Sequence, residues 1–153
     1  MPMDLTSEFN QRCVFCQIVA GEIEASVVYQ DDLVTAFMDL YPVTPGHTLV
    51  IPNLHAALIT EVQPDTVKHM FGVGARINRA IRKSRIRCEA MSLYLADGTA
   101  AGQVVHHTHL HLIPRFQGDA CGIRLHAGRI EKPQRKELDE QASQIQSSLE
   151  SEH

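Results

Sequence analysis

Three of the four histidines between positions 104 and 114 alternate with other residues. Residues two apart on a β-strand point to the same face of the sheet, about 7 Å from each other. The alternation therefore predicts a strand over residues 104–114 that presents His107, His109 and His111 on one face. A row of imidazoles is costly unless the side chains have polar partners or a ligand. The row indicates a functional site built on a β-sheet.

The segments around this row carry strand and helix signals. Two β-branched runs flank Asp31-Asp32 and predict a hairpin. Apolar side chains at helical spacing after Pro64 predict a long helix over residues 65–84. The remaining predicted elements are a short helix over residues 14–20, strands over 26–30, 33–39, 47–52 and 91–96, and a weakly amphipathic helix from Lys132 onward. Strands in antiparallel clusters around one long helix predict the α+β class.

A length of 153 residues suits one domain. We expect residues 1–12, which are polar, to be a flexible N-terminus, and residues 13–153 to form a single domain with a C-terminal helical tail. No signal peptide is recognised, and no apolar run approaches the roughly 20 residues that a membrane helix needs. The expected location is therefore cytoplasmic, with no membrane partner.

The formal net charge of -4 disfavours a general binder of nucleic-acid polymers. Six of the fourteen Lys and Arg residues nevertheless lie within residues 76–87. This basic stretch is either a local site for an anion or RNA, or a solvated helix face near the negative end of the helix dipole. The second interpretation is favoured.

Imidazole chemistry leaves two uses for the histidine row. A neutral imidazole is a nucleophile near pH 7 and also a metal ligand. Neighbouring row members on a flat strand reach one tetrahedral ion poorly. Attack on phosphorus is the alternative, and it needs hydrogen-bond donors and a loop that positions the phosphate. The loop of residues 97–103 directly precedes the row, where Gly102 permits close backbone approach and Gln103 offers an amide donor.

Cys13 and Cys16 form a Cys-x-x-Cys pair. In a cytoplasmic protein this spacing is more typical of a metal or redox pair than of a structural disulfide. A structural zinc ion takes four nitrogen or sulfur ligands. The alternative is two small buried thiols without a metal. Cys88 and Cys121 have no partner motif and are expected to be ordinary buried or loop residues.

Residues 107–113 resemble the signature of the histidine-triad (HIT) family of nucleotide hydrolases and transferases, although Thr108 stands where an apolar residue is commoner. Residues 13–23, 36–39 and 45–55 resemble the same family in the same order. The resemblance covers roughly residues 13–116 and is strongest to the bacterial Hint-type branch. Residues 97–115 also resemble the Fhit-type branch.

The resemblance implies an antiparallel sheet of about five strands with one long helix, usually paired as a homodimer. It implies that His109 attacks the α-phosphorus of purine nucleotide conjugates, such as those of AMP or GMP, and that water then releases the monophosphate. By resemblance His107, His111, Gly102 and Gln103 line the phosphate site.

The resemblance also assigns the nucleoside. Asp39 binds the ribose hydroxyls, although a turn former at a strand end is the alternative role for this residue. The apolar side chains expected around the base are Phe15, Ile18, Ile23 and Leu40. For these four, a place in the ordinary hydrophobic core is the alternative.

Bacterial members of the family complete a structural zinc site with two histidines. The matching positions here are His55 and His107, which would join Cys13 and Cys16. A zinc ion on His107 would occupy a nitrogen that could then not serve the phosphate.

Two residues depart from the family pattern. Ala96 stands where an amide side chain is usual, and Val104 stands where many members carry Ser or Thr. A slower enzyme or an altered leaving group is expected. Three hypotheses follow: a hydrolase of nucleoside phosphoramidates or dinucleoside polyphosphates, a catalytically weak nucleotide-binding regulator, and a zinc-stabilised interaction module. The third gives no reason for His109, His111 and Gln103.

Overall fold

The computed structural model describes residues 12–121 and 132–150. The expected flexible N-terminus lies outside the described residues, apart from Arg12. The chain divides into two compact units at the junction of Cys121 and Gly122. The second unit contains helix α4 (Arg135–Glu150), which confirms the predicted C-terminal helix. No helix in either described range combines the length and the apolar character needed to cross a membrane.

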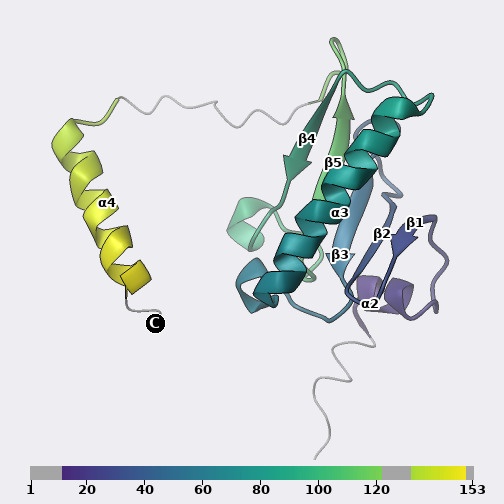
Figure 1. Ribbon diagram of the computed structural model, residues 1–153, viewed down its shortest axis with the longest axis horizontal. Coiled ribbons are helices and arrows are strands. Elements are labelled where there is room, and N and C mark those ends of the chain that lie inside the picture. The colour runs from purple at the N-terminus through teal and green to yellow at the C-terminus, as the bar shows by residue number, and fades with distance from the viewer. Residues whose placement is uncertain (1–11, 122–131, 151–153) are drawn as a thin grey trace, which may run out of the picture. The chain divides into compact units, whose positions relative to one another are not determined.

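The first unit is built on one antiparallel sheet with the strand order β1-β2-β3-β5-β4 (Figure 1). The strands are β1 (Val27–Gln30), β2 (Val34–Met38), β3 (Thr48–Pro52), β4 (Ala90–Tyr94) and β5 (Leu110–Arg115). The predicted hairpin is confirmed, because β1 and β2 pair antiparallel around Asp31. The Asp31 carboxylate closes this turn by accepting the backbone N–H groups of Leu33 and Val34. The α+β class is likewise confirmed.

Helix α3 (Pro64–Lys83) lies across one face of the sheet, over β2, β3 and β5 (Figure 1). Pro64 begins it, which suits a position whose N–H has no helical partner. Its buried residues are Met70, Val73, Gly74, Ile77 and Ile81. They pack against every second strand residue, namely Val34, Ala36, Val50, Leu110 and Leu112. A Cβ at Gly74 would lie 3.3 Å from Leu110 Cδ2, so this glycine lets the helix approach β5 closely.

The opposite face of the sheet packs against α2 (Val14–Val19), the predicted short helix. Phe15 of α2 packs on Phe37, Leu49 and Ile51. These strand residues alternate with those that face α3, because side chains of a strand point to opposite faces in turn. The functional residues described below lie on this second face.

The strand predicted over residues 104–114 is wrong in its first half, because β5 begins at Leu110. The preceding residues follow the loop after β3 instead. Thr108 donates its backbone N–H to the Ala56 carbonyl (2.7 Å), and His107 Nε2 lies 2.8 Å from the Pro52 carbonyl oxygen. Of the three histidines, only His111 belongs to the strand. The expectation that all three share one strand face is therefore also wrong.

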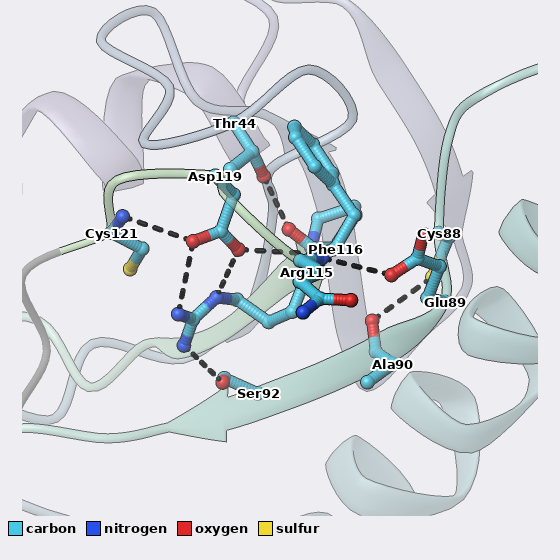
Figure 2. A network of polar contacts seen from close by, with 11 residues as sticks. Thr44, Cys88, Glu89, Ala90, Ser92, Arg115, Phe116, Asp119 and Cys121 are labelled. Atoms are coloured by element: carbon cyan, nitrogen blue, oxygen red, sulfur yellow. Dashed lines mark hydrogen bonds and ion pairs between the residues drawn. The ribbon is translucent and has the colours of Figure 1, made fainter.

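The turn after β5 is closed by Asp119 (Figure 2). Its carboxylate accepts hydrogen bonds from the Arg115 guanidinium (Nε–Oδ2 2.6 Å) and from the backbone N–H groups of Phe116 and Cys121. Arg115 also donates to Ser92 Oγ of β4 (3.1 Å). The Arg115 hydrogen bond is the main cause that holds the Asp119 pKa well below its usual range. This network joins the end of β5 to β4.

Candidate active site

A cavity of about 530 Å³ opens on the α2 face of the sheet. Its floor is a row of side chains that runs across four strands. Phe37 pairs with Leu49, Leu49 with His111, and His111 with Tyr94. Paired residues of antiparallel strands share a face, and all four side chains line the cavity. The sheet therefore places His111 on the floor of the cavity, between two neighbours fixed by strand register.

His109 also lines the cavity, although only 7% of its surface is exposed. Its Nδ1 lies 2.7 Å from the His107 carbonyl oxygen, so Nδ1 carries the proton and donates it. Burial is the main cause that lowers the His109 pKa, and the neutral ring predominates at pH 7. In that tautomer Nε2 holds an unshared electron pair, which makes it the nucleophilic atom.

His111 is oriented by His47, a residue that the sequence predictions did not single out. Val43 donates its backbone N–H to His47 Nδ1 (3.0 Å), so neutral His47 carries its proton on Nε2. That Nε2 lies 2.9 Å from His111 Nδ1 and donates to it. His111 therefore carries its own proton on Nε2. The only sequence signal for His47 was its place at the start of a predicted strand, directly after Pro45-Gly46.

Burial sets the charge of both rings in this pair. It is the main cause that lowers the His47 pKa, and it lowers the His111 pKa to about 4 with help from neighbouring His109 and His47. Asp39 is close enough to these histidines that the three residues could group around a cation. The His47 tautomer disfavours that use. Because Nδ1 accepts the Val43 N–H, a metal on Nε2 would require a His47 ring with no proton on either nitrogen. The cluster fits a chain of hydrogen bonds.

Asp39 follows β2 and lines the cavity. Its Oδ1 accepts the backbone N–H of Tyr41 (2.8 Å), and its Oδ2 lies 3.5 Å from His47 Nε2. The residue thus closes a turn, which was the alternative role considered for it, and also presents a carboxylate to the cavity.

The apolar residues expected around the base all line the cavity, namely Phe15, Ile18, Ile23 and Leu40. They differ in burial. Phe15 is 7% exposed and belongs to the core, whereas Leu40 is 82% exposed. Leu40 is therefore not a core residue, and its apolar side chain lines the cavity while largely exposed.

The loop before the histidine run contains the turn η2 (Thr99–Ala101) and then Gly102. Gly102 lines the cavity with φ of 92°, a left-handed conformation that favours glycine. Gln103 is buried, and its amide donates to the Ala57 and Val105 carbonyls while its oxygen accepts the Gly98 N–H. In this arrangement Gln103 holds the loop in shape, and its contact with phosphate stays a prediction. Val104 lines the cavity mouth and is 86% exposed.

Cys13, Cys16, His55 and His107 bring their ligand atoms within 4.8 Å of one another. His107 Nδ1 lies 3.4 Å from Cys13 Sγ and 3.5 Å from Cys16 Sγ, and His55 Nδ1 lies 3.3 Å from Cys16 Sγ. Because His107 Nε2 donates to the Pro52 carbonyl, Nδ1 presents its electron pair to the thiols. Two sulfurs and two nitrogens form a donor set typical of structural zinc, and the hydrogen bond to the Pro52 carbonyl orients the His107 ring, as such bonds do for histidines that ligate metals.

Protonation in this cluster also responds to burial. Burial and neighbouring Cys13 raise the pKa of the Cys16 thiol to about 12, and burial lowers the His107 pKa to about 4. A bound cation favours thiolate, as it does for any coordinating thiol. His107 is fully buried and does not line the cavity.

The profile of the HIT domain matches residues 20–118. The chain belongs to the HIT domain family. A HIT family protein from Bacillus anthracis is 37% identical, with a TM-score of 0.83 over 90% of this chain and 96% of that one. A zinc-bound histidine triad family protein from Mycobacterium smegmatis is 38% identical, with a TM-score of 0.71 over 94% and 99%. Adenylylsulfatase HINT3 of Arabidopsis thaliana is 36% identical over 94% of this chain and 71% of its own length.

The basic stretch of this HIT protein makes several contacts with its own surface. Arg76 lies over the Tyr29 ring at 5.2 Å and Arg87 over the Phe116 ring at 4.2 Å. Arg82 donates to the Glu89 carbonyl (3.4 Å). Arg76 and Arg82 lie on α3, as the favoured interpretation of a helix face expects, whereas Arg87 lies beyond the end of α3 at Lys83.

Proposed function

We propose that this HIT protein binds purine nucleotide conjugates and transfers their nucleoside monophosphate group to water through His109. One observation carries the proposal. The His109 Nδ1–H donates to the His107 carbonyl at 2.7 Å, which leaves the Nε2 electron pair on a ring that lines the cavity. Asp39, at the same cavity, supplies a carboxylate suited to ribose hydroxyls.

The proposed reaction has two steps. In the first, His109 Nε2 forms a bond to the α-phosphorus as the bond from phosphorus to the leaving group breaks. The leaving group keeps that electron pair and takes a proton from solvent, while the His111 Nε2–H donates a hydrogen bond to it, because His47 holds the other nitrogen. In the second, water attacks phosphorus, the nitrogen–phosphorus bond breaks with its electron pair returning to His109 Nε2, and the water proton passes to solvent. The monophosphate leaves, His109 is neutral again, and His111 stays neutral throughout.

The charges of the cavity favour a leaving group of low negative charge. Within residues 12–121 and 132–150, no Lys or Arg side chain lines this cavity, while Glu24 and Asp39 do. A polyphosphate leaving group would carry several negative charges without a cationic partner. We therefore place nucleoside phosphoramidates ahead of dinucleoside polyphosphates, and adenylylsulfate, the substrate in the name of the Arabidopsis relative, is a further compound to test.

A catalytically weak nucleotide-binding regulator is the second candidate. Two observations favour it: both amide hydrogens of Gln103 are engaged by carbonyls, and Val104 presents no hydroxyl to the cavity. Both reduce the donors available to stabilise charge on phosphate.

We also infer that zinc, when bound by Cys13, Cys16, His55 and His107, is structural and joins α2 to the segment that carries His109. A homodimer is part of the proposal as well. Strand β4 is an edge of the sheet, and its Leu93 is 46% exposed. Light scattering on the purified chain tests the dimer.

The test compares turnover of adenosine phosphoramidate, adenylylsulfate and diadenosine polyphosphates by the wild type and by His109→Ala. Loss of the nucleophile should lower kcat at least about a thousandfold. His106→Ala is the matched control, since His106 is the exposed neighbour of the run. Wild-type protein that binds AMP but turns over no substrate would leave the regulator as the function.

A further inference from the structure

We propose that Tyr94 is a positioning residue with two separate tasks: its ring aligns His111, and its hydroxyl holds the phosphate loop. The inference rests on the proposed function, since it concerns the same cavity. Tyr94 is the last residue of β4, and it pairs in register with His111 of β5. It lines the cavity, so it reaches the site from the edge of the sheet.

The ring of Tyr94 completes an aromatic enclosure around His111. Its centroid lies 5.5 Å from the His111 centroid, at an interplanar angle of 44°. The other two rings of the enclosure are His47 at 5.1 Å and His109 at 4.8 Å. His47 fixes the tautomer of His111 through a hydrogen bond, but a single hydrogen bond leaves a ring free to tilt about it. Contact with Tyr94 restricts that tilt and so fixes the direction of the His111 Nε2–H.

The hydroxyl of Tyr94 contacts a different part of the site. It donates to the Ala101 carbonyl (3.0 Å), at the end of the η2 turn. The next residue is Gly102, where a Cβ would lie 3.8 Å from the same hydroxyl oxygen. Gln103 holds the inner side of this loop through Gly98, and Tyr94 ties its outer side to β4. The loop then places Gly102 and Val104 along the cavity.

These two contacts predict different kinetic effects. The loop lies where the substrate phosphate would bind, so loss of the hydroxyl should act mainly on binding. Loss of one neutral hydrogen bond should raise KM and the Kd for AMP about threefold to tenfold in Tyr94→Phe, with kcat within about twofold. Loss of the ring in Tyr94→Leu frees His111, so kcat should be about tenfold lower in Tyr94→Leu than in Tyr94→Phe.

The experiment measures kcat, KM and AMP affinity for the wild type, Tyr94→Phe and Tyr94→Leu, together with nitrogen-15 shifts of the His111 imidazole. Tyr29→Phe is the matched control, because it removes a tyrosine hydroxyl that bonds to Asp31 outside the cavity. The expected result is a KM effect alone in Tyr94→Phe, and an added kcat loss with altered His111 shifts in Tyr94→Leu.

A merely structural Tyr94 would lower the melting temperature of both variants and leave KM, kcat and the His111 shifts of the folded fraction unchanged, which would overturn the inference. Equal losses of kcat in both variants would also overturn it. Failure of the proposed function is a different result, since a wild type without turnover still has an AMP affinity and His111 shifts. Those two readouts must then change in Tyr94→Phe and Tyr94→Leu respectively, or the inference fails too.

Discussion

His107 and His111 stand on either side of His109, and the protein uses them in opposite ways. His107 is fully buried, donates through Nε2 to the Pro52 carbonyl, and turns Nδ1 toward two thiols. His111 is half-buried, accepts at Nδ1 from His47, and lines the cavity. Burial is the main cause that lowers the pKa of each ring to about 4, so both are neutral at pH 7. The difference lies in the partner of the second nitrogen, which decides whether a neutral ring offers an electron pair or a proton.

The largest effect should come from removing the two thiols that face His107. Replacing both Cys13 and Cys16 with Ser should abolish zinc binding and lower the free energy of unfolding by about 4 kcal/mol, since loss of a metal is among the most damaging changes. Metal analysis and denaturant unfolding measure it. Cys88→Ser is the control, because Cys88 donates to the Ala90 carbonyl and packs on the α3 side of the core, away from the Cys13 and Cys16 cluster. A wild type purified with zinc and a double variant that keeps it would contradict the assignment.

The His111 side should respond in catalysis and not in stability. His111→Gln should lower kcat about a hundredfold, the effect of losing a positioned hydrogen-bond donor to the leaving group, with zinc content unchanged. His107→Gln should instead lower the zinc content and the melting temperature. If His111→Gln releases zinc, the two histidines are not separated as the structure implies.

Loss of the His47 hydrogen bond should have a smaller effect. His47→Phe keeps a ring in a buried position but removes the donor to His111 Nδ1, so kcat should fall about tenfold. His47→Gln, whose amide both donates and accepts, should recover part of the loss. Steady-state kinetics on both variants measure this, and equal rates in the two would argue against a tautomer-fixing role.

The mildest test changes only pH. Because burial lowers the pKa of His109, and that of His111 to about 4, turnover should stay level as pH falls from 7 through the ordinary histidine range. It should decline at lower pH, once His109 takes up a proton and loses its nucleophilic electron pair. Stability should decline earlier, since an unfolded histidine with its ordinary pKa takes up a proton below about pH 6.5, before the folded one does. A pH–rate profile with circular dichroism at each pH separates the two effects. A turnover midpoint near pH 6.5 in still-folded protein would show that burial does not shield at least one of these two rings.

Local patterns predicted most of the fold. The hairpin around Asp31 and the long helix after Pro64 depend on turn residues and apolar spacing that lie within each segment. The histidine run was harder, because its path depends on a distant partner. The backbone leaves the sheet before Leu110 to bond with Ala56 and Pro52, and no period within the run records that.

The candidate site divides in the same way between residues that a motif marks and residues that only tertiary contacts bring in. The cysteine pair, Asp39 and His109 could be named from sequence, because each belongs to a recognisable motif. His47 and the engaged amide of Gln103 could not, since their distant partners, His111 and the Ala57 carbonyl, are set by tertiary structure.

The cavity lining has a spectroscopic consequence. The chain contains three tyrosines and no tryptophan, and two of the tyrosines, Tyr41 and Tyr94, line the cavity. The third, Tyr29, lies beneath Arg76 and bonds to Asp31. Tyrosine emission therefore originates largely at the cavity, and in a Tyr29→Phe background all of it would. The protein thus carries its own optical probe of occupancy, which can be followed in a stopped-flow cell without any added label.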